Sequence, residues 1–196
     1  KKASEFSQDI HQVILRSLEH PKVCALGEVG LDYSGCHRKH SKAQKAALRQ
    51  LLTTAREANK PVIIHCRDAD DDCFEIVSDC LPRYWKIHLH CFTRGWQSAS
   101  KWCSTFPNLY VGLTPLVTWG SQGPGSVAKN IPLERLLLET DAPYFVPRGF
   151  PRATLVSDPT MAIHVAYEVA KVRGVVVDEV LLHCLGNTRR MYSVHI

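Results

Sequence analysis

The sequence predicts an α/β protein with a largely parallel sheet, either doubly wound or part of a (β/α)8 barrel. Short apolar runs alternate with longer amphipathic stretches along almost the whole chain. Aliphatic runs bounded by Gly, Pro or charged residues are typical of buried parallel strands. The chain has 196 residues, of which 45% are hydrophobic and 22% charged. This size and composition are typical of one globular domain and exclude the disordered and fibrous classes.

The apolar runs predict strands, and the amphipathic stretches between them predict helices. The expected strands are Val23–Glu28, Pro61–His65, Lys86–His90, Leu109–Leu113 and Arg135–Asp141. The expected helices cover residues 3–20, 41–59, 69–80, 95–105, 122–130, 158–173 and 177–192. Because short crossovers join successive strands, the connections are expected to be right-handed and the sheet parallel.

The helix at 41–59 has the clearest period. Leu48 and Leu52 lie on its apolar face, and Lys45 and Arg49 belong to a basic stripe on the opposite face. This stripe either contacts a phosphate backbone or is a solvated outer face. We favour the solvated face.

Composition also limits the partners and the compartment. The chain has 24 Lys and Arg against 19 Asp and Glu, a net charge of +5, which is compatible with a polyanionic partner without establishing one. No stretch approaches 18 consecutive apolar residues, so no membrane span is expected. None of the eight cysteines forms a Cys-x-x-Cys pair, which favours reduced thiols in the nucleus or cytoplasm. The first residues lack an initiator Met, and we expect the sequence to continue upstream.

Metal-ligand side chains end four of the five expected strands. Glu28, His65, His90 and Asp141 are each the first such residue after an apolar run. Since the carboxyl ends of parallel strands share one edge of the sheet, the four side chains are expected to converge. A lone histidine there is more often a hydrogen-bonded core residue, but four ligands in register favour a metal site. Nitrogen and oxygen donors together suit Mg²⁺, Mn²⁺ or Zn²⁺, and such ions activate water for hydrolysis.

Because side chains alternate between the two faces of a strand, the sequence predicts on which face the neighbours of these residues lie. Leu26 is expected to share a face with Glu28, and His88 to share a face with His90 one layer deeper. Glu139 is expected to be a supporting or interior carboxylate. No G-x-S-x-G elbow, P-loop or G-x-G-x-x-G motif offers a competing chemistry.

Four segments in order resemble the TatD-related metal-dependent deoxyribonucleases. They are Gly27–Tyr33 (GEVGLDY), Val62–Ala69 (VIIHCRDA), His90–Thr93 (HCFT) and Leu138–Tyr144 (LETDAPY), and Gly186–Tyr192 fits the closing helix of the family. The resemblance covers the whole chain and implies a single TatD-like nuclease domain over residues 1–196, with its N-terminal part incomplete. The implied fold is a TIM-type (β/α)8 barrel of the metal-dependent hydrolase kind, with about five βα units visible here.

The resemblance also implies roles for the strand-end residues. Glu28 would bridge two divalent cations, with Mg²⁺ favoured over Mn²⁺ or Zn²⁺. His65 and His90 would bind one ion. Asp141 would bind the other and act as general base, so Glu28 and Asp141 are the expected catalytic residues.

The implied substrate is a nucleic acid. Members of the family cleave DNA, and some cleave RNA, commonly as 3′→5′ exonucleases and at damaged sites. Arg67, Phe92 and Arg148 lie just past expected strand ends, where they would contact a phosphate or a terminal base. Ordinary loop packing is an equal alternative for each of the three.

The sequence departs from the family pattern in three places. An early His-x-His on a first strand has no counterpart before Val23. Arg94 follows the His-Cys-Phe-Thr segment where Gly is more common, and Asp158 stands where the family has Glu in an Asn-Glu-Pro segment. The alternative function is therefore a catalytically impaired module that binds nucleic acid or a protein partner. A third reading is a metal-dependent hydrolase of small esters or amides.

Overall fold

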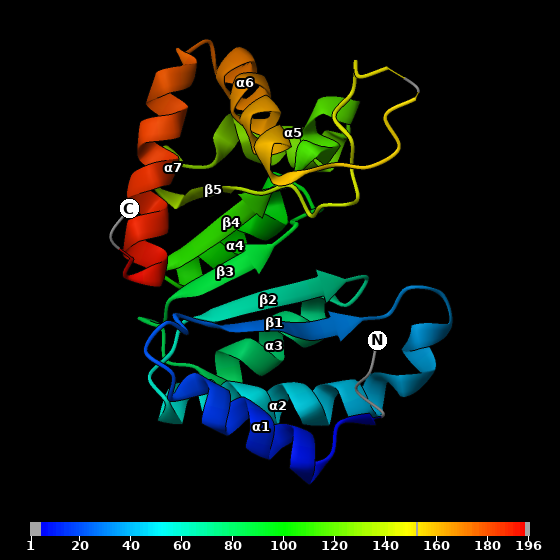
Figure 1. Cartoon of the computed structure of the whole chain (residues 1–196), viewed down its shortest axis with the longest axis vertical. Coiled ribbons are helices and arrows are strands. Elements are labelled where there is room, and N and C mark those ends of the chain that lie inside the picture. The colour runs from blue at the N-terminus through cyan, green and yellow to red at the C-terminus, as the bar shows by residue number, and fades with distance from the viewer. Residues whose placement is uncertain (1–4, 152, 195–196) are drawn as a thin grey trace.

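A sheet of five parallel strands forms the centre of the molecule (Figure 1). The computed structural model describes residues 5–151 and 153–194. Neighbouring strands in the sheet are also neighbours in sequence, in the order β1-β2-β3-β4-β5. The strands are β1 (Leu26–Asp32), β2 (Val62–Arg67), β3 (Ile87–His90), β4 (Leu109–Leu113) and β5 (Leu136–Leu138). The predicted α/β class with five βα units is confirmed, and the described sheet is open, with β1 and β5 at its edges.

Helices connect the strands and cover one face of the sheet. They are α1 (Gln8–Leu18), α2 (Ser41–Glu57), α3 (Asp70–Cys80), α4 (Trp96–Thr105), α5 (Gln122–Asn130), α6 (Ala162–Arg173) and α7 (Val177–Tyr192). Short 3-10 segments are η2 (Gly35–His40), η3 (Pro115–Trp119), η4 (Leu133–Arg135) and η5 (Pro159–Met161). In Figure 1, α1 to α3 lie on the β1–β2 side and α6 and α7 on the β5 side. Residues 3 and 4 of the predicted first helix lie outside the described residues.

The main hydrophobic core lies between the sheet and these helices. Val62 and Ile64 of β2 and Ile87 of β3 are fully buried there against Leu48 and Leu52 of α2. Since side chains alternate along a strand, the residues between them point to the opposite face. We call this opposite face, which carries His65, His88 and His90, the inner face.

Helix α7 passes the β5 edge and closes a small second core. Tyr110, Leu137 and Met191 are buried together there. Fully buried Asn187 anchors the helix, because its side-chain amide donates to the carbonyls of Leu133 (2.7 Å) and Leu136 (2.6 Å). The last turn of α7 is thereby fixed beside the inner face.

The limits of β1 correct the predicted strand Val23–Glu28. The strand begins at Leu26 and continues to Asp32, with one extra residue inserted between Leu26 and Val29 relative to β2. Glu28 therefore lies inside the strand rather than at its end. Leu26 is 7% exposed and the Glu28 side chain 46% exposed, so the prediction that they share a face was wrong. A bulge reverses the side to which the following residues point.

Two other predicted strand ends also move. Strand β2 continues past His65 to Arg67, which pairs with Asp32 of β1. Strand β5 ends at Leu138, so Asp141 lies in the following loop, with a φ of 55°. Of the four predicted ligands, only His90 ends its strand as predicted, and β4 has the predicted limits Leu109–Leu113.

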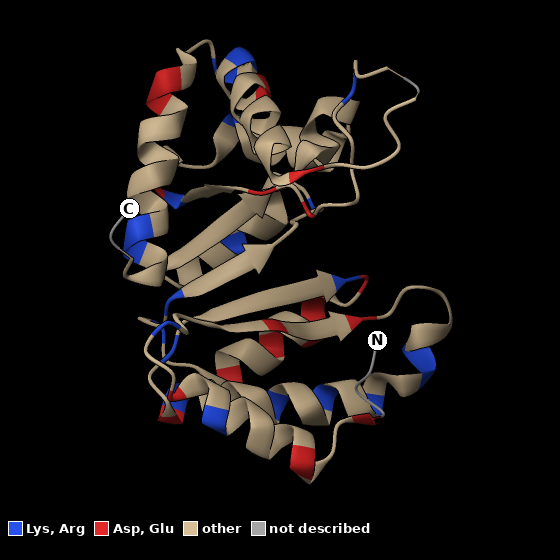
Figure 2. Cartoon of the chain, viewed as in Figure 1, with Lys and Arg blue, Asp and Glu red and all other residues tan. Residues whose placement is uncertain are grey.

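The basic stripe of α2 is largely occupied by contacts with α3. Lys45 lies 2.7 Å from Asp72, and both terminal nitrogens of Arg49 lie 3.2 Å from Asp79. Figure 2 shows Lys and Arg positions on α2 and Asp and Glu positions on the neighbouring α3. Lys45 and Arg49 of the stripe are thus partly exposed and paired with α3, an arrangement that the prediction of a solvated outer face did not include.

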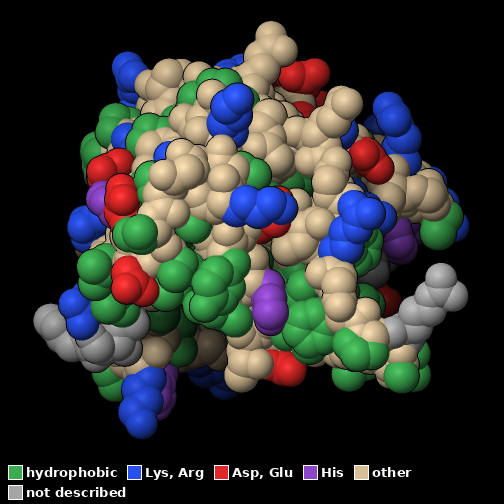
Figure 3. Space-filling model, turned by 90° about the horizontal axis from the view of Figure 1, so that it is seen from above, with side chains coloured by type: hydrophobic (Ala, Val, Ile, Leu, Met, Phe, Trp, Pro, Cys, Tyr) green, Lys and Arg blue, Asp and Glu red, His purple; other side chains and the backbone are tan. Residues whose placement is uncertain are grey.

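The remaining charge is spread over the molecule. Seen from above, Lys and Arg side chains are interspersed with acidic and apolar ones (Figure 3). Within the described residues, no helix is long and apolar enough to cross a membrane.

Replacing Asn187 by Ala is expected to lower the free energy of unfolding by about 2–4 kcal/mol, because two buried carbonyls lose their donor and a cavity remains. Urea unfolding followed by circular dichroism measures this. Asn130→Ala is the matched control, since Asn130 is exposed and donates only to Ser126. Its cost should stay below about 1 kcal/mol. Equal costs for the two variants would contradict an anchoring role for Asn187.

Candidate active site

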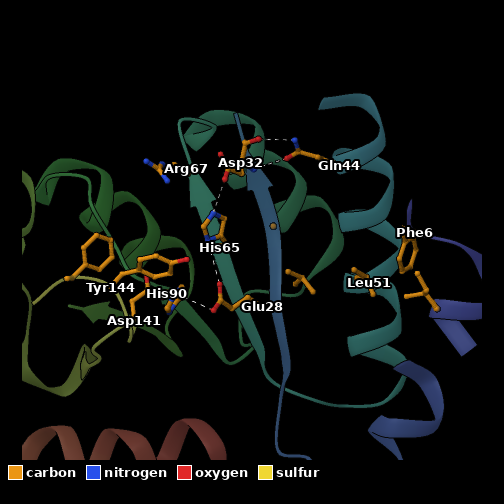
Figure 4. Close-up of a pocket in the computed structure, with 14 residues that line it drawn as sticks. Phe6, Glu28, Asp32, Gln44, Leu51, His65, Arg67, His90, Asp141 and Tyr144 are labelled. Atoms are coloured by element: carbon orange, nitrogen blue, oxygen red, sulfur yellow. Dashed lines mark hydrogen bonds and ion pairs between the residues drawn. The ribbon is translucent and has the colours of Figure 1, made fainter. Parts of the chain in front are cut away.

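An open pocket of about 740 Å³ lies at the carboxyl ends of the strands (Figure 4). Glu28 of β1, His65 of β2 and His90 of β3 line it from the inner face. Asp141 and Tyr144 line it from the loop after β5. The four residues that the sequence predicted as metal ligands therefore share one pocket.

The nitrogen and oxygen atoms of these four residues approach one another closely. Glu28 Oε1 lies 3.4 Å from His90 Nε2, and Glu28 Oε2 lies 3.6 Å from His65 Nδ1. His90 Nε2 also lies 3.5 Å from Asp141 Oδ1. The carboxylate of Glu28 thus presents one oxygen to each histidine, and His90 faces both carboxylates.

These separations and donor types suit a divalent cation. They exceed the usual 2.7–3.2 Å of an N–H···O hydrogen bond. They are close to the spacing of two donors that bind one ion at roughly 2.1 Å, about 3.0 Å in an octahedral shell and about 3.4 Å in a tetrahedral one. No three of the described His, Cys, Asp and Glu side chains yet enclose a complete site. The donor pairs therefore fit a cation, which would need further ligands to complete its shell.

A buried carboxylate orients His90 from behind. Glu139 contacts His90 Nδ1, accepts a 2.6 Å hydrogen bond from His88 Nε2, and accepts from the backbone N–H of Cys91 at 3.2 Å. A proton on Nδ1 of His90 leaves the lone pair of Nε2 facing Glu28, which is the arrangement that a metal-ligating histidine requires. Glu139 thus has the supporting position that the sequence predicted for it.

The charges of Glu139 and His90 are mutually stabilised. Burial disfavours the charged carboxylate, but His88 and His90 outweigh it and lower the pKa of Glu139 to about 2. Burial also disfavours a charged imidazole, yet the hydrogen bond to Glu139 and the nearby carboxylates raise the pKa of His90 to about 9. In the absence of cations, His90 is therefore protonated at neutral pH and holds the positive charge at the centre of the site.

The pKa values of the two pocket carboxyl groups, Glu28 and Asp141, are shifted in opposite directions. The interaction with His65 lowers the pKa of Glu28. Burial, together with the negative charge of Glu28, raises the pKa of Asp141. Glu28 thus stays ionised as a ligand should, whereas Asp141 has the greater tendency to accept a proton.

The hydrogen-bond chain continues to helix α7. His88 lies on the inner face one layer below His90, as predicted, and its Nδ1 lies 2.6 Å from the hydroxyl of Tyr192. The role of Tyr192 was missed, although it closes the segment Gly186–Tyr192 that carried part of the resemblance. Tyr192 is far from β3 in the sequence, so no local sequence pattern predicts its contact with His88.

Asp32 is a further carboxylate that sequence reasoning missed. It is buried at the end of β1, accepts a 2.8 Å hydrogen bond from the backbone of Ser34, and lies 3.9 Å from His65 Nε2. The side-chain amide of Gln44 of α2 holds Asp32 in place, because it accepts from the backbone N–H of Asp32 and donates to its backbone carbonyl. The signal was present in the GEVGLDY segment, but the predicted strand stopped at Glu28.

The three predicted substrate contacts have different positions. Arg67 is exposed and lines the pocket. Phe92 is only 9% exposed and packs in the main core, so its predicted contact with a base is not compatible with the structure. The chain turns at Cys91, with a φ of 44°, and directs Phe92 inward. Arg148 does not line the pocket; its backbone N–H donates to Thr118.

This pocket and fold define a TatD-type hydrolase. The family model for TatD related DNase matches residues 1–193, and the chain belongs to this family. It is 39% identical over 195 residues to the human 3'-5' RNA nuclease TATDN2, covering 98% of this chain and 26% of that protein. It is 35% identical over 196 residues to the 3'-5' ssDNA/RNA exonuclease TatD of Pantoea vagans, covering 98% of this chain and 74% of that protein.

A solved structure shows the same fold. A TatD homologue from Escherichia coli superimposes with a TM-score of 0.87 at 28% identity, covering 98% of this chain and 73% of that one. The predicted fold class and the predicted family are therefore confirmed. The chain spans about a quarter of the human relative and about three quarters of the bacterial ones.

Glu139→Gln is expected to lower the free energy of unfolding by about 2–4 kcal/mol without added metal, because a neutral amide cannot accept from both histidines. Mn²⁺ affinity, measured by titration calorimetry, should fall roughly 10- to 100-fold as His90 loses its orientation. Glu134→Gln removes an exposed carboxylate of the same size and should change stability by less than about 0.5 kcal/mol. Unchanged Mn²⁺ affinity in a folded Glu139→Gln variant would count against the supporting role.

Proposed function

We propose that this chain contains the catalytic site of a divalent-metal-dependent nuclease that hydrolyses phosphodiester bonds in DNA or RNA. The observation that carries the proposal is the convergence of Glu28, His65, His90 and Asp141 in one open pocket. Two carboxylates and two imidazoles provide metal ligands and a proton acceptor together, which hydrolysis of a phosphodiester requires.

The names of the relatives support a single-stranded substrate attacked from its 3′ end. One relative is called a 3'-5' RNA nuclease and others 3'-5' ssDNA/RNA exonucleases. The openness of the pocket at the strand ends leaves room for a chain end, and exposed Arg67 at its rim supplies a positive charge for a phosphate.

Glu28, His65, His90 and Asp141 would hold two divalent cations, with Mg²⁺ the favoured ion and Mn²⁺ or Zn²⁺ also compatible with the donors. When bound, these ions lower the pKa of water and offset the charge that develops on the phosphate. Glu28 lies at the centre of this set, because its two carboxylate oxygens face His65 and His90.

The remaining residues have roles in proton transfer and orientation. Asp141, which faces His90 across the pocket, would take the proton from the water that attacks phosphorus as the P–O bond to the released nucleotide breaks. Glu139 and His88 keep His90 in one orientation during this step. Arg67 binds a phosphate at the pocket rim.

We also propose a nuclear or cytoplasmic location. All eight cysteines are free in the structure, including buried Cys73 and Cys184. Free thiols support a reducing compartment.

Glu28→Gln and Asp141→Asn are each expected to lower the rate of phosphodiester cleavage at least about 100-fold, because one loses a bridging ligand and the other the proton acceptor. Cleavage of a 3′-labelled single-stranded oligonucleotide with Mg²⁺ or Mn²⁺ measures this, and EDTA should abolish cleavage by the unchanged chain.

Glu75→Gln, on the exposed side of α3, is the matched control and should retain full activity. Full activity of both folded site variants would refute the assigned roles. Salt-dependent binding of the oligonucleotide without any metal-supported cleavage by the unchanged chain would favour the non-catalytic alternative.

Arg67→Ala is expected to raise KM about 5- to 10-fold with little change in kcat, because a phosphate contact contributes to binding rather than to the chemical step. The slope of log affinity against log salt should become shallower by about 1. Arg16→Ala, an exposed arginine of α1, serves as the control. If the slope of log affinity against log salt is the same for the unchanged chain, Arg67→Ala and Arg16→Ala, Arg67 does not contact a phosphate.

A further inference from the structure

Three aromatic side chains lie in a row beside the pocket. The ring centres of Trp119 and Phe145 are 6.0 Å apart at 77°, and those of Phe145 and Tyr144 are 6.3 Å apart at 52°. We call Trp119, Tyr144 and Phe145 the aromatic ledge. Tyr144 and Phe145 line the same pocket as the predicted metal ligands, so the ledge is continuous with the site.

Two of the three ledge rings are exposed. Tyr144 is 64% exposed and Trp119 is 47% exposed. By comparison, Trp85, Trp102 and Phe106 are each less than 10% exposed, and exposed Tyr84 and Tyr167 lie away from the pocket. Exposed apolar surface at the rim of a pocket marks a place where a ligand or partner binds.

Backbone contacts hold the ledge in place. The indole N–H of Trp119 donates to the carbonyl of Val146 at 2.9 Å, and the backbone N–H of Tyr144 donates to the carbonyl of Asp141 at 3.0 Å. Phe145 has a φ of 58°, a conformation that bulky residues rarely adopt and that tends to occur at functional sites. A ledge fixed in advance loses little conformational entropy when a flat ligand stacks on it.

Tyr144 lies next to the reacting groups. It follows Asp141 by three residues, and Figure 4 shows both side chains on one side of the pocket, opposite Glu28 and His65. A planar group stacked on Tyr144 would therefore have its covalently attached phosphate within reach of the carboxylates. A nucleotide has this form, with a flat base joined through its sugar to a phosphate.

We propose that Tyr144, supported by Phe145 and Trp119, stacks the base of the terminal nucleotide of a single strand. This inference rests on the proposed nuclease function and adds a specificity element to it. A base at a duplex end would have to leave its pair to lie on Tyr144 with its phosphate in the pocket, and this costs pairing energy, so the ledge favours unpaired ends. Since every base has an aromatic face, the ledge tolerates any sequence.

The test compares two single-stranded oligonucleotides that differ only in the last nucleotide. One ends in an ordinary nucleotide and the other in an abasic residue, and both carry phosphorothioate linkages at the 3′ end and a 5′ fluorophore. Fluorescence anisotropy with Mg²⁺ should show the base-bearing strand binding roughly 5- to 150-fold more tightly to the unchanged chain, the range that one base stack supplies.

Tyr144→Ala should reduce this preference to less than about 2-fold, and Tyr144→Phe should keep it, because the ring and not the hydroxyl makes the stack. Tyr84→Ala is the matched control, since Tyr84 is 69% exposed and does not line the pocket. Both Tyr144 variants should unfold at the same urea concentration as the unchanged chain, as expected for an exposed ring.

The outcomes separate this inference from the nuclease proposal. Equal binding of the two strands by the unchanged chain, or a preference that survives Tyr144→Ala, would overturn base stacking even if an unmodified strand is still cleaved. A chain that shows no cleavage of an unmodified strand contradicts the proposed function, and the binding preference then still decides whether the ledge recognises a base.

Discussion

The side chain of Glu139 brings a negative charge into the interior, and that charge must be neutralised by protein groups. Two histidines and one backbone N–H of the β3 segment surround it. A buried carboxylate without such partners would cost several kcal/mol, so the folded state fixes all of these donors at once. The orientation of His90 toward the pocket is therefore a consequence of folding and does not depend on a bound ligand.

This arrangement also explains a glycine. Gly112 lies on β4 beside the inner face, where a Cβ atom would collide with the carboxylate of Glu139 and the ring of His88. Only a residue without a side chain leaves room for the ion pair between His88 of β3 and Glu139, which follows β5. The apolar residues of β4 meanwhile face the helices, so one strand serves both the main core and the site.

The parts of this structure that depend on local sequence pattern were predictable. Apolar runs between amphipathic stretches predicted the five strands, and parallel alignment placed His65 and His90 side by side. The bulge in β1 was not predictable, because it exists only in the pairing of β1 with β2. The positions of Phe92 and Tyr144 depend on turns after strands, whose direction is set by tertiary contacts rather than by nearby residues.

The pocket joins two kinds of structure with different constraints. Glu28, His65 and His90 lie on strands whose opposite faces pack in the core, so their positions can change little without loss of stability. Asp141 and Tyr144 lie in the loop after β5, which only a few backbone contacts secure. Asp141, the proposed proton acceptor, and Tyr144, the proposed stacking residue, therefore share one loop, and a change in the path of that loop affects both proposed roles.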